Sequence, residues 1–179
     1  MGLLLRAVAM MLLLPGTGAF LVPWLIRRWG HGRFEAGDAQ WAGVAPLAAG
    51  LAGLLWCIAD FARRGRGTVA FHDPPREMVR CGLYRYVRNP MYVACLVCLA
   101  GQVFLYETWF IALWGVALFG IFNLLVLLHE EPSLRRRFGD AYGRYLEEVP
   151  RWMPRAPRRG GEPIDVAPAP ADVRAASRP

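Results

Sequence analysis

The sequence predicts an all-α membrane protein, a polytopic helical bundle of about four transmembrane helices with an amphipathic C-terminal helix on the cytoplasmic side. Two observations carry this prediction. Of the 179 residues, 55% are hydrophobic and 20% are charged, which is a more apolar composition than that of an average soluble domain. The charged residues also stand in short blocks between long apolar stretches, whereas a soluble fold needs polar side chains along every element.

The first two apolar stretches are each expected to form one span. Residues 3–26 are interrupted only by Arg6, and this run is longer than the apolar core of a signal peptide, which is the alternative interpretation. Residues 41–62 form the second predicted span. The small residues in it, which let helix backbones approach closely in lipid, are Gly43, Ala49, Gly50 and Gly53.

The next apolar stretch, residues 90–128, predicts a helical hairpin. It contains a single charged residue, Glu107, and it is too long for one helix across a bilayer core of about 30 Å at about 1.5 Å per residue. We therefore expect two spans, 90–106 and 109–128, joined by a tight turn around Glu107.

Apolar side chains recur at helical spacing after Pro132, a residue that is suited to begin a new helix. They are Leu134, Phe138, Tyr142, Tyr145 and Val149. This pattern predicts an amphipathic helix over 132–149, on the membrane surface or beneath the bundle. The integral membrane domain would then span 1–154, and the tail 155–179, rich in proline, alanine, glycine and arginine, is expected to be disordered.

The arginines predict the orientation in the membrane. All 21 basic residues are arginine, and the net charge is +7. Arginines cluster in the loop 63–89 and again at 135–137, while the hairpin turn has none, so both basic segments are expected in the cytoplasm and the turn outside. Arginines in the first connection (Arg27, Arg28, Arg33) oppose this assignment but are outnumbered. We assign the basic charge to anionic lipids of the cytoplasmic (inner) membrane and not to nucleic acid.

The four cysteines do not predict a metal site or a disulfide framework. Three of them lie inside apolar stretches. Cys95 and Cys98 have the spacing of a redox or metal motif, but no second pair and no nearby histidine completes a zinc set. We interpret the cysteines as small packing residues.

Two polar segments are expected on the same side of the membrane, and the first precedes the helix at residue 90. Asn89 is suited to cap this helix, and Pro90 suits its first position. Arg85 and Arg88 stand just before the helix, whose free N–H groups favour a carboxylate or a phosphate. A capped helix flanked by interfacial arginines is the alternative interpretation.

The second polar segment is the adjacent pair Glu130 and Glu131. Two carboxylates at the end of a span require donors, either the hydroxyls of a ligand ribose or an arginine such as Arg88 or Arg135. His129 beside them is a proton acceptor or, in the preferred interpretation, an interfacial residue.

Together the segments describe a pocket with anion donors on one wall and carboxylates on the other. S-adenosylmethionine, which has a carboxylate, an ammonium, a sulfonium and a ribose, suits such a pocket, whereas NADPH would require more basic contacts. The chain has neither a G-x-G-x-x-G segment between a strand and a helix nor a G-x-x-x-x-G-K-[ST] segment, so a cofactor pocket of the soluble type is not expected.

The order and spacing of these motifs resemble the isoprenylcysteine carboxyl methyltransferase family, and the related phospholipid methyltransferases share part of the pattern. The resemblance covers about residues 41–154. The matching segments are Gly65-x-Gly67-Thr68, Asp73-Pro74-Pro75, Gly82-x-Tyr84-Arg85-Tyr86-x-Arg88-Asn89-Pro90-x-Tyr92, Glu130-Glu131-Pro132-x-Leu134, Phe138-Gly139-x-x-Tyr142 and Val149-Pro150-Arg151-x-x-Pro154.

The resemblance implies an integral membrane methyltransferase that uses S-adenosylmethionine and a lipophilic or membrane-associated acceptor. The residues that it implies for the cofactor site are Arg88, Asn89, Pro90, Tyr92, Glu130 and Glu131, with Tyr142, Tyr145 and Arg151 closing the site from below. The residues that it implies for catalysis are Arg88, Glu130 and Glu131.

Two positions depart from the family pattern. Asn89 replaces the usual histidine, and Ala94 stands where a glycine is frequent. Asparagine keeps hydrogen bonding but does not titrate near neutral pH. If the family's histidine only holds the cofactor, the replacement changes little, and if it moves protons, activity on an amine would suffer.

Our leading hypothesis is methyl transfer from S-adenosylmethionine to a carboxylate, an amine or a thiol. A carboxylate acceptor needs no base, whereas an amine or a thiol would be deprotonated by Glu130, Glu131 or His129. The alternatives are an NADPH-dependent membrane reductase and a non-catalytic membrane scaffold. The sequence specifies neither the acceptor nor the oligomeric state.

Overall fold

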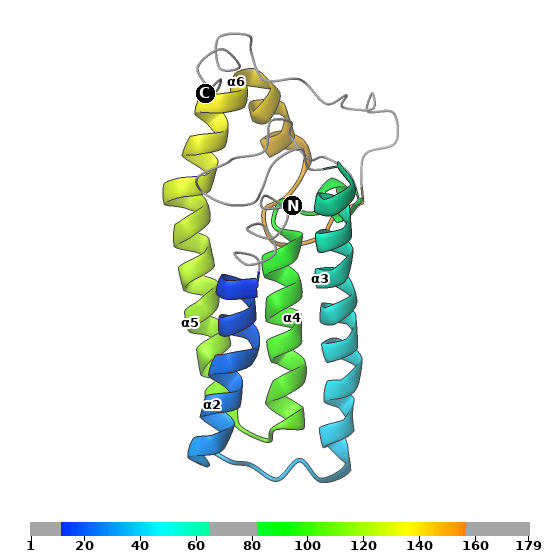
Figure 1. The fold of residues 1–179 in the computed structure, drawn as a ribbon, viewed down its shortest axis with the longest axis vertical. Coiled ribbons are helices and arrows are strands. Elements are labelled where there is room, and N and C mark those ends of the chain that lie inside the picture. Colours follow the sequence, from blue (N-terminus) through cyan, green and yellow to red (C-terminus); the bar gives the residue numbers. More distant parts are fainter. Residues whose placement is uncertain (1–11, 65–81, 157–179) are drawn as a thin grey trace.

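The computed structural model describes residues 12–64 and 82–156, and the structural statements below concern these two ranges. The described chain is helical, with one isolated antiparallel bridge between Arg33 and Thr108. Its elements are η1 (Leu12–Leu21), α2 (Val22–Trp29), η2 (Gly37–Gly43), α3 (Val44–Arg64), η3 (Gly82–Arg85), α4 (Pro90–Leu105), α5 (Trp109–Leu125), η4 (Val126–Glu130) and α6 (Glu131–Glu148). Helices α2 to α5 run along the long axis of the bundle and α6 lies at one end (Figure 1). The all-α prediction is confirmed for the described ranges.

Two described helical stretches are long and apolar enough to cross a membrane. They are Gly37–Asp60 and Trp109–Arg136, while Pro90–Leu105 is apolar but shorter. The first predicted span, 3–26, begins outside the described residues, and its described part continues to Trp29. The count of four spans therefore stays a prediction.

The beginning of the described chain is anchored to the hairpin by hydrogen bonds. Element η1 is a π-helix, and two of its carbonyl groups accept bonds from side chains of other helices. Trp114 Nε1 donates to Gly18 O at 2.7 Å, and Gln102 Nε2 donates to Ala19 O at 2.7 Å. These bonds satisfy backbone groups that would otherwise face an apolar environment.

Glycines allow α3 and its preceding turn to lie directly against α4. A Cβ atom on Gly50 would stand 2.5 Å from Cys98 Sγ, and one on Gly43 would stand 2.3 Å from the carbonyl oxygen of Gly101. The expectation that small residues permit close helix approach is confirmed for Gly43, Gly50 and Gly53, whereas Ala49 is exposed. Gly101, which the sequence analysis did not single out, is their counterpart on α4, and Cys57, Cys95 and Cys98 are buried in the helix packing.

Gly101→Ala is expected to lower the free energy of unfolding by about 1–3 kcal/mol, because overpacking forces rigid backbone apart. The added Cβ would lie 2.6 Å from Gly43 O and 2.6 Å from Leu47 N. Gly120 on α5 has nothing within 4 Å of such an atom. Gly120→Ala should therefore change stability by less than about 1 kcal/mol. Thermal unfolding in detergent, followed by circular dichroism, measures the stability of both variants. Equal losses of stability would mean that close packing at Gly101 does not cause the effect.

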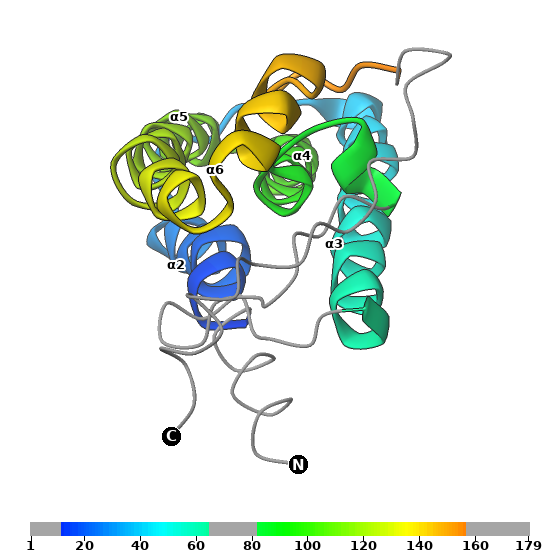
Figure 2. The same ribbon diagram turned by 90° about the horizontal axis from the view of Figure 1, so that it is seen from above.

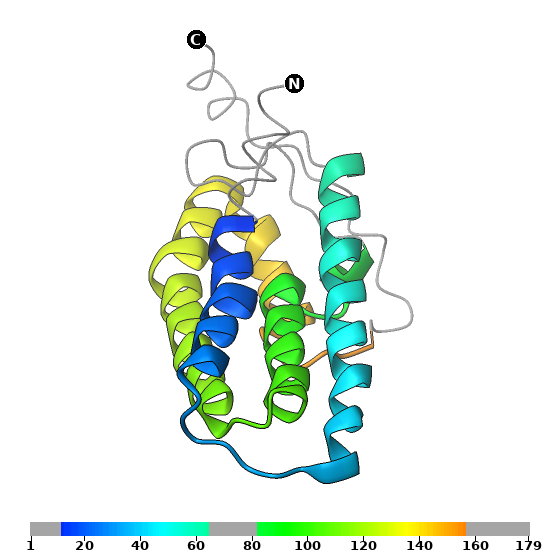
Figure 3. The same cartoon turned by 60° about the horizontal axis from the view of Figure 1, so that its bottom comes forward.

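The predicted turn between α4 and α5 is confirmed, and the first connection is fastened to it. Glu107 adopts a left-handed conformation with φ 49°. Phe34 N donates to Glu107 O at 2.9 Å, and Thr108 Oγ1 donates to His31 O at 3.1 Å. Figure 3 shows the connection from α2 to α3 passing beside this turn. The arginine-containing connection and the hairpin turn therefore lie at the same end of the bundle, as a four-span topology requires.

The helix of the fourth predicted span does not end at residue 128. Pro132 stands in the first turn of α6, as expected, but α6 follows directly on α5 and the π-helical η4 and is not separated from them. A π-turn bonds i to i+5, and such a turn directly before Pro132 accommodates the missing N–H of the proline. The break occurs at Gly139, with φ 50° and ψ −128°, a conformation that glycine adopts at little cost.

Beyond the break, the chain turns back over the end of the bundle. Figure 2 shows α6 lying across the end of α4. Most of the predicted apolar face of this helix is buried in one cluster with Leu134 packed against it, and the buried members are Phe138, Tyr142, Tyr145 and Val149. The predicted tail, 155–179, lies outside the described residues except for its first two positions.

Candidate functional site

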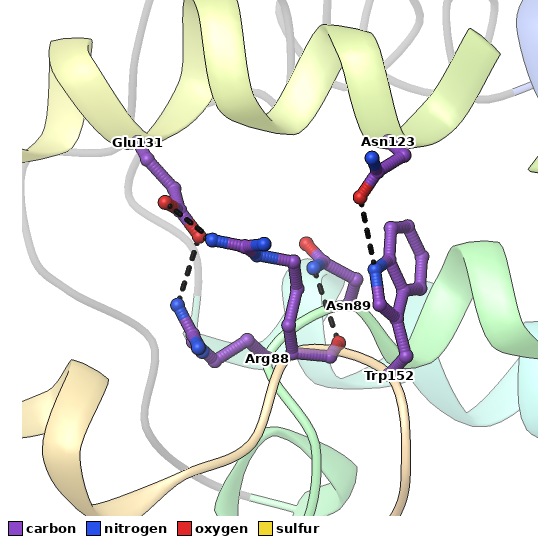
Figure 4. A network of polar contacts seen from close by, with 6 residues as sticks. Arg88, Asn89, Asn123, Glu131 and Trp152 are labelled. Atoms are coloured by element: carbon purple, nitrogen blue, oxygen red, sulfur yellow. Dashed lines mark hydrogen bonds and ion pairs between the residues drawn. The ribbon is translucent and has the colours of Figure 1, made fainter. Parts of the chain in front are cut away.

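The two adjacent carboxylates face different parts of the structure. Successive residues on a helix point about 100° apart, while residues four apart share a face. Phe122, Val126 and Glu130 form one stripe, whose first two side chains are buried. Asn123 and Glu131 belong to a second stripe and point to the same side of the helix (Figure 4). The pair is therefore two single carboxylates, each with its own partners.

Glu131 joins two arginines from distant segments. Arg88 Nη1 donates to Glu131 Oε1 at 2.8 Å. Arg151 donates to both oxygens of the same carboxylate, from Nε at 2.8 Å and from Nη2 at 2.9 Å. The side chains of Arg88 and Glu131 are each 14% exposed, and that of Arg151 is 29% exposed. This pairing with Arg88 was one of the expected alternatives, whereas the role of Arg151 as a partner of Glu131 was not foreseen.

Glu130 is bonded to α4. The hydroxyl of Tyr92 donates to Glu130 Oε1, and the Tyr92 ring stacks on Phe122 with a centroid distance of 4.3 Å. Only one oxygen of Glu130 accepts a hydrogen bond from a described residue. The other oxygen is an acceptor that a ligand can use.

Tyr92→Phe is expected to lower the free energy of unfolding by about 1–2 kcal/mol, because it removes a donor to a carboxylate and leaves the ring stack intact. Tyr86→Phe serves as the control, since Tyr86 is 43% exposed in the preceding loop. The free energy of unfolding of Tyr86→Phe should fall by no more than about 0.5 kcal/mol. Chemical denaturation of both variants in one detergent measures their free energies of unfolding. An equal decrease in the two variants would mean that the Tyr92–Glu130 bond does not stabilise the fold.

Asn89 does not cap α4 with its side chain. It stands at the capping position with φ −120° and ψ 58°, and it makes no side-chain capping bond. Its Nδ2 instead donates to the carbonyl oxygen of Arg151 at 3.2 Å. The expected side-chain cap is thus corrected, and the amide instead joins the start of α4 to the segment after α6. Pro90 occupies the helix start as predicted.

The segment after α6, residues 150–155, forms a strap across the site. Arg88 N donates to Pro150 O at 2.9 Å, and Arg155 N donates to Tyr86 O at 2.9 Å. Trp152 Nε1 donates to Asn123 Oδ1 on α5 at 3.2 Å (Figure 4). The sequence analysis missed Trp152 and Asn123. The available signal was the amide of Asn123 inside an apolar span.

The two predicted tyrosines of α6 have different surroundings. Burial, followed by the negative charge of Glu131, raises the pKa of Tyr142 to about 12, so its hydroxyl stays protonated at neutral pH. Tyr145 donates to the carbonyl oxygen of Tyr84 at 2.9 Å and so joins α6 to η3. Tyr142 therefore lies near the charged cluster, and Tyr145 supports the loop that carries it.

The charges of the cluster are incompletely matched. Two guanidinium groups, on Arg88 and Arg151, share the single carboxylate of Glu131. Among the described residues, Arg88 Nε is buried with no hydrogen-bond partner. A buried donor without a partner and a surplus positive charge favour an anionic ligand group. Glu130 is a second carboxyl group nearby, bonded to Tyr92.

The described residues form a helical bundle with two membrane-length apolar stretches, and two arginines and two carboxylates gather at the junction of α4, α5 and the strap. Residues 39–141 match the model of the phospholipid methyltransferase family, and the chain belongs to this family. Its membership makes it a membrane methyltransferase that acts on a lipid-like substrate. No curated protein matches the chain significantly. The matched range contains Arg88, Tyr92, Glu130 and Glu131, while the strap lies beyond it.

Proposed function

We propose that the protein transfers a methyl group from S-adenosylmethionine to a lipid-like acceptor in the membrane. The observation that carries the proposal is the cluster in which Arg88 and Arg151 share the carboxylate of Glu131, with a buried N–H that has no partner within the described ranges. A single ligand carboxylate suits this cluster, whereas NADPH carries several phosphate charges. Glu130 adds an acceptor for an ammonium or a ribose hydroxyl.

The residues present fit the zwitterionic cofactor. Arg88 and Arg151 would hold its carboxylate, and the free oxygen of Glu130 would accept from its ammonium or ribose. The other residues proposed for the cofactor site are Asn89, Pro90, Tyr92, Glu131, Tyr142 and Tyr145. When bound, S-adenosylmethionine supplies a methyl group that its sulfonium already activates.

Each charged residue has a proposed task. Glu131 positions the two arginines, since both of its oxygens are occupied by them. Glu130 is the carboxylate left to accept a proton from an amine or thiol acceptor, and a carboxylate acceptor needs no base. The strap excludes water from the arginines, which strengthens their attraction for an anion.

The direct test supplies methyl-tritiated S-adenosylmethionine, or NADPH tritiated at the transferred hydride, to membranes that contain the protein. We expect label from S-adenosylmethionine in the lipid extract, dependent on Glu130 and Arg88, and none from NADPH. Label from NADPH alone would establish the reductase alternative. No label from either, with a folded protein, would favour the non-catalytic scaffold.

We further propose that the site faces the cytoplasm from the cytoplasmic membrane. Exposed arginines at the site end, Arg85, Arg135 and Arg136, support this orientation. A green fluorescent protein fused to the C-terminus should then fluoresce, and an alkaline phosphatase fused there should be inactive. The reverse pattern would place the site outside.

A further inference from the structure

We infer that the strap re-enters the bundle at the depth of the membrane and that Trp152 forms its lipid-facing surface, on which the acyl chain of a bilayer phospholipid lies. The identity of the neighbouring site rests on the proposed function, but the lipid contact does not. Three observations carry the inference: where Trp152 docks, what surrounds it, and how the strap backbone is bonded.

Trp152 docks within a candidate membrane span. Its indole donates to Asn123 and its ring meets Phe119 edge-on at a centroid distance of 5.0 Å. Both partners belong to the stretch Trp109–Arg136, which is long and apolar enough to cross a membrane. Asn123 stands eight residues before Glu131, which corresponds to about 12 Å along a helix axis. The strap therefore reaches well below the carboxylate cluster.

Trp152 is half-buried and packs against the buried cluster of the bundle, while the helix face beside it is apolar and exposed. On the same helix, Val116, Phe119 and Leu127 are 69%, 40% and 39% exposed. Such side chains on a membrane-spanning helix face acyl chains. Met153, the next residue of the strap, is 78% exposed and extends this apolar surface. Asn123 interrupts the apolar face, and the indole of Trp152 occupies its amide oxygen.

Part of the strap backbone is bonded by protein groups. Irregular backbone is tolerated at membrane depth only where protein groups bond it. Pro150 O accepts from Arg88 N, Arg151 O accepts from Asn89 Nδ2, and Arg155 N donates to Tyr86 O. The strap thus places Arg151 in the charged cluster and Trp152 against the apolar face. It separates the cluster from the hydrocarbon, and an acyl chain beside the site contacts Trp152.

The test measures the fluorescence of Trp152 in vesicles of phosphatidylcholine that is brominated high on one acyl chain. The Trp152 signal is the difference between the wild-type protein and Trp152→Phe. Trp56 is the reference, since it is 55% exposed within the candidate span Gly37–Asp60, and its signal is obtained from Trp56→Phe. Acrylamide is the quencher in the aqueous phase, and unbrominated vesicles give the unquenched fluorescence. Binding of S-adenosylhomocysteine is measured in the same samples.

We expect brominated lipid to quench Trp152 clearly, although less than the more exposed Trp56, and acrylamide to leave the fluorescence of Trp152 unchanged. Quenching by acrylamide alone would place the strap in water, and quenching by neither would place Trp152 inside the protein; both results overturn the inference. If Trp152→Phe does not fold, Met153→Trp keeps the native indole and adds a reporter next to it, with the same expected result. If the wild-type protein does not bind S-adenosylhomocysteine, this result would count against the proposed function but not against the lipid contact of Trp152.

Discussion

Glu131→Ala is expected to lower the free energy of unfolding by about 3 kcal/mol and to abolish binding of S-adenosylhomocysteine. The carboxylate accepts bonds from Arg88 and Arg151, so its removal leaves two guanidinium groups without a counter-charge in a mostly buried place. Their repulsion should release the strap, which carries Arg151. Chemical denaturation and calorimetric titration in the same detergent measure the two effects.

Glu147→Ala is the matched control, because Glu147 lies on the same helix and is exposed. It should change stability by no more than about 0.5 kcal/mol and leave ligand binding intact. Glu131→Gln retains one acceptor oxygen and should fall between the wild-type protein and the alanine variant. Wild-type stability in Glu131→Ala would mean that the ion pairs contribute nothing to the fold.

Arg88→Ala is expected to weaken binding of S-adenosylhomocysteine by about 2 kcal/mol, which corresponds to roughly thirtyfold in Kd. The variant removes one of the two guanidinium groups of the cluster and the buried Nε that has no partner among the described residues. The bidentate bonds between Arg151 and Glu131 remain, so the protein should still fold. Calorimetric titration measures the change in Kd.

Arg85→Ala separates this effect from a general loss of positive charge. Arg85 precedes the same helix but is exposed, so its removal should change Kd by less than about threefold. Both arginines flank the start of α4, and the family resemblance implies only Arg88 for the cofactor site. Equal changes in Kd for the two variants would mean that the positive charge at this end of the bundle attracts the ligand from a distance. Such a result would contradict a specific contact between Arg88 and the ligand carboxylate.

Much of the fold could be predicted because apolar runs and glycines act locally. The hairpin around Glu107 follows from the length of one apolar stretch, and the approach of α3 to α4 follows from Gly43 and Gly50. The continuous helix through Pro132 could not be predicted from local rules, because the π-turn before it changes the hydrogen-bond register. In the sequence, Gly139 is only one position of a family motif, whereas its positive φ makes it the point of the break.

The site could be predicted as a set of residues but not as a set of contacts. The motifs indicated Arg88, Glu130, Glu131 and Arg151, but spacing along the chain does not say that Glu131 binds both arginines. That contact depends on the break at Gly139, which brings the strap back to α4. Trp152 and Asn123 escaped notice for the same reason, since a 29-residue separation leaves no periodic signal.

In the proposed function, the arginine cluster holds the carboxylate of S-adenosylmethionine. Calorimetric titration of the lipid-supplemented protein with S-adenosylhomocysteine, and with 5′-methylthioadenosine, which lacks the carboxylate, tests this contact most directly. We predict that S-adenosylhomocysteine binds about thirtyfold more tightly, and that this advantage disappears in Arg88→Ala. Equal affinity for both ligands in the folded wild-type protein, or no binding of either, would contradict the proposed contact.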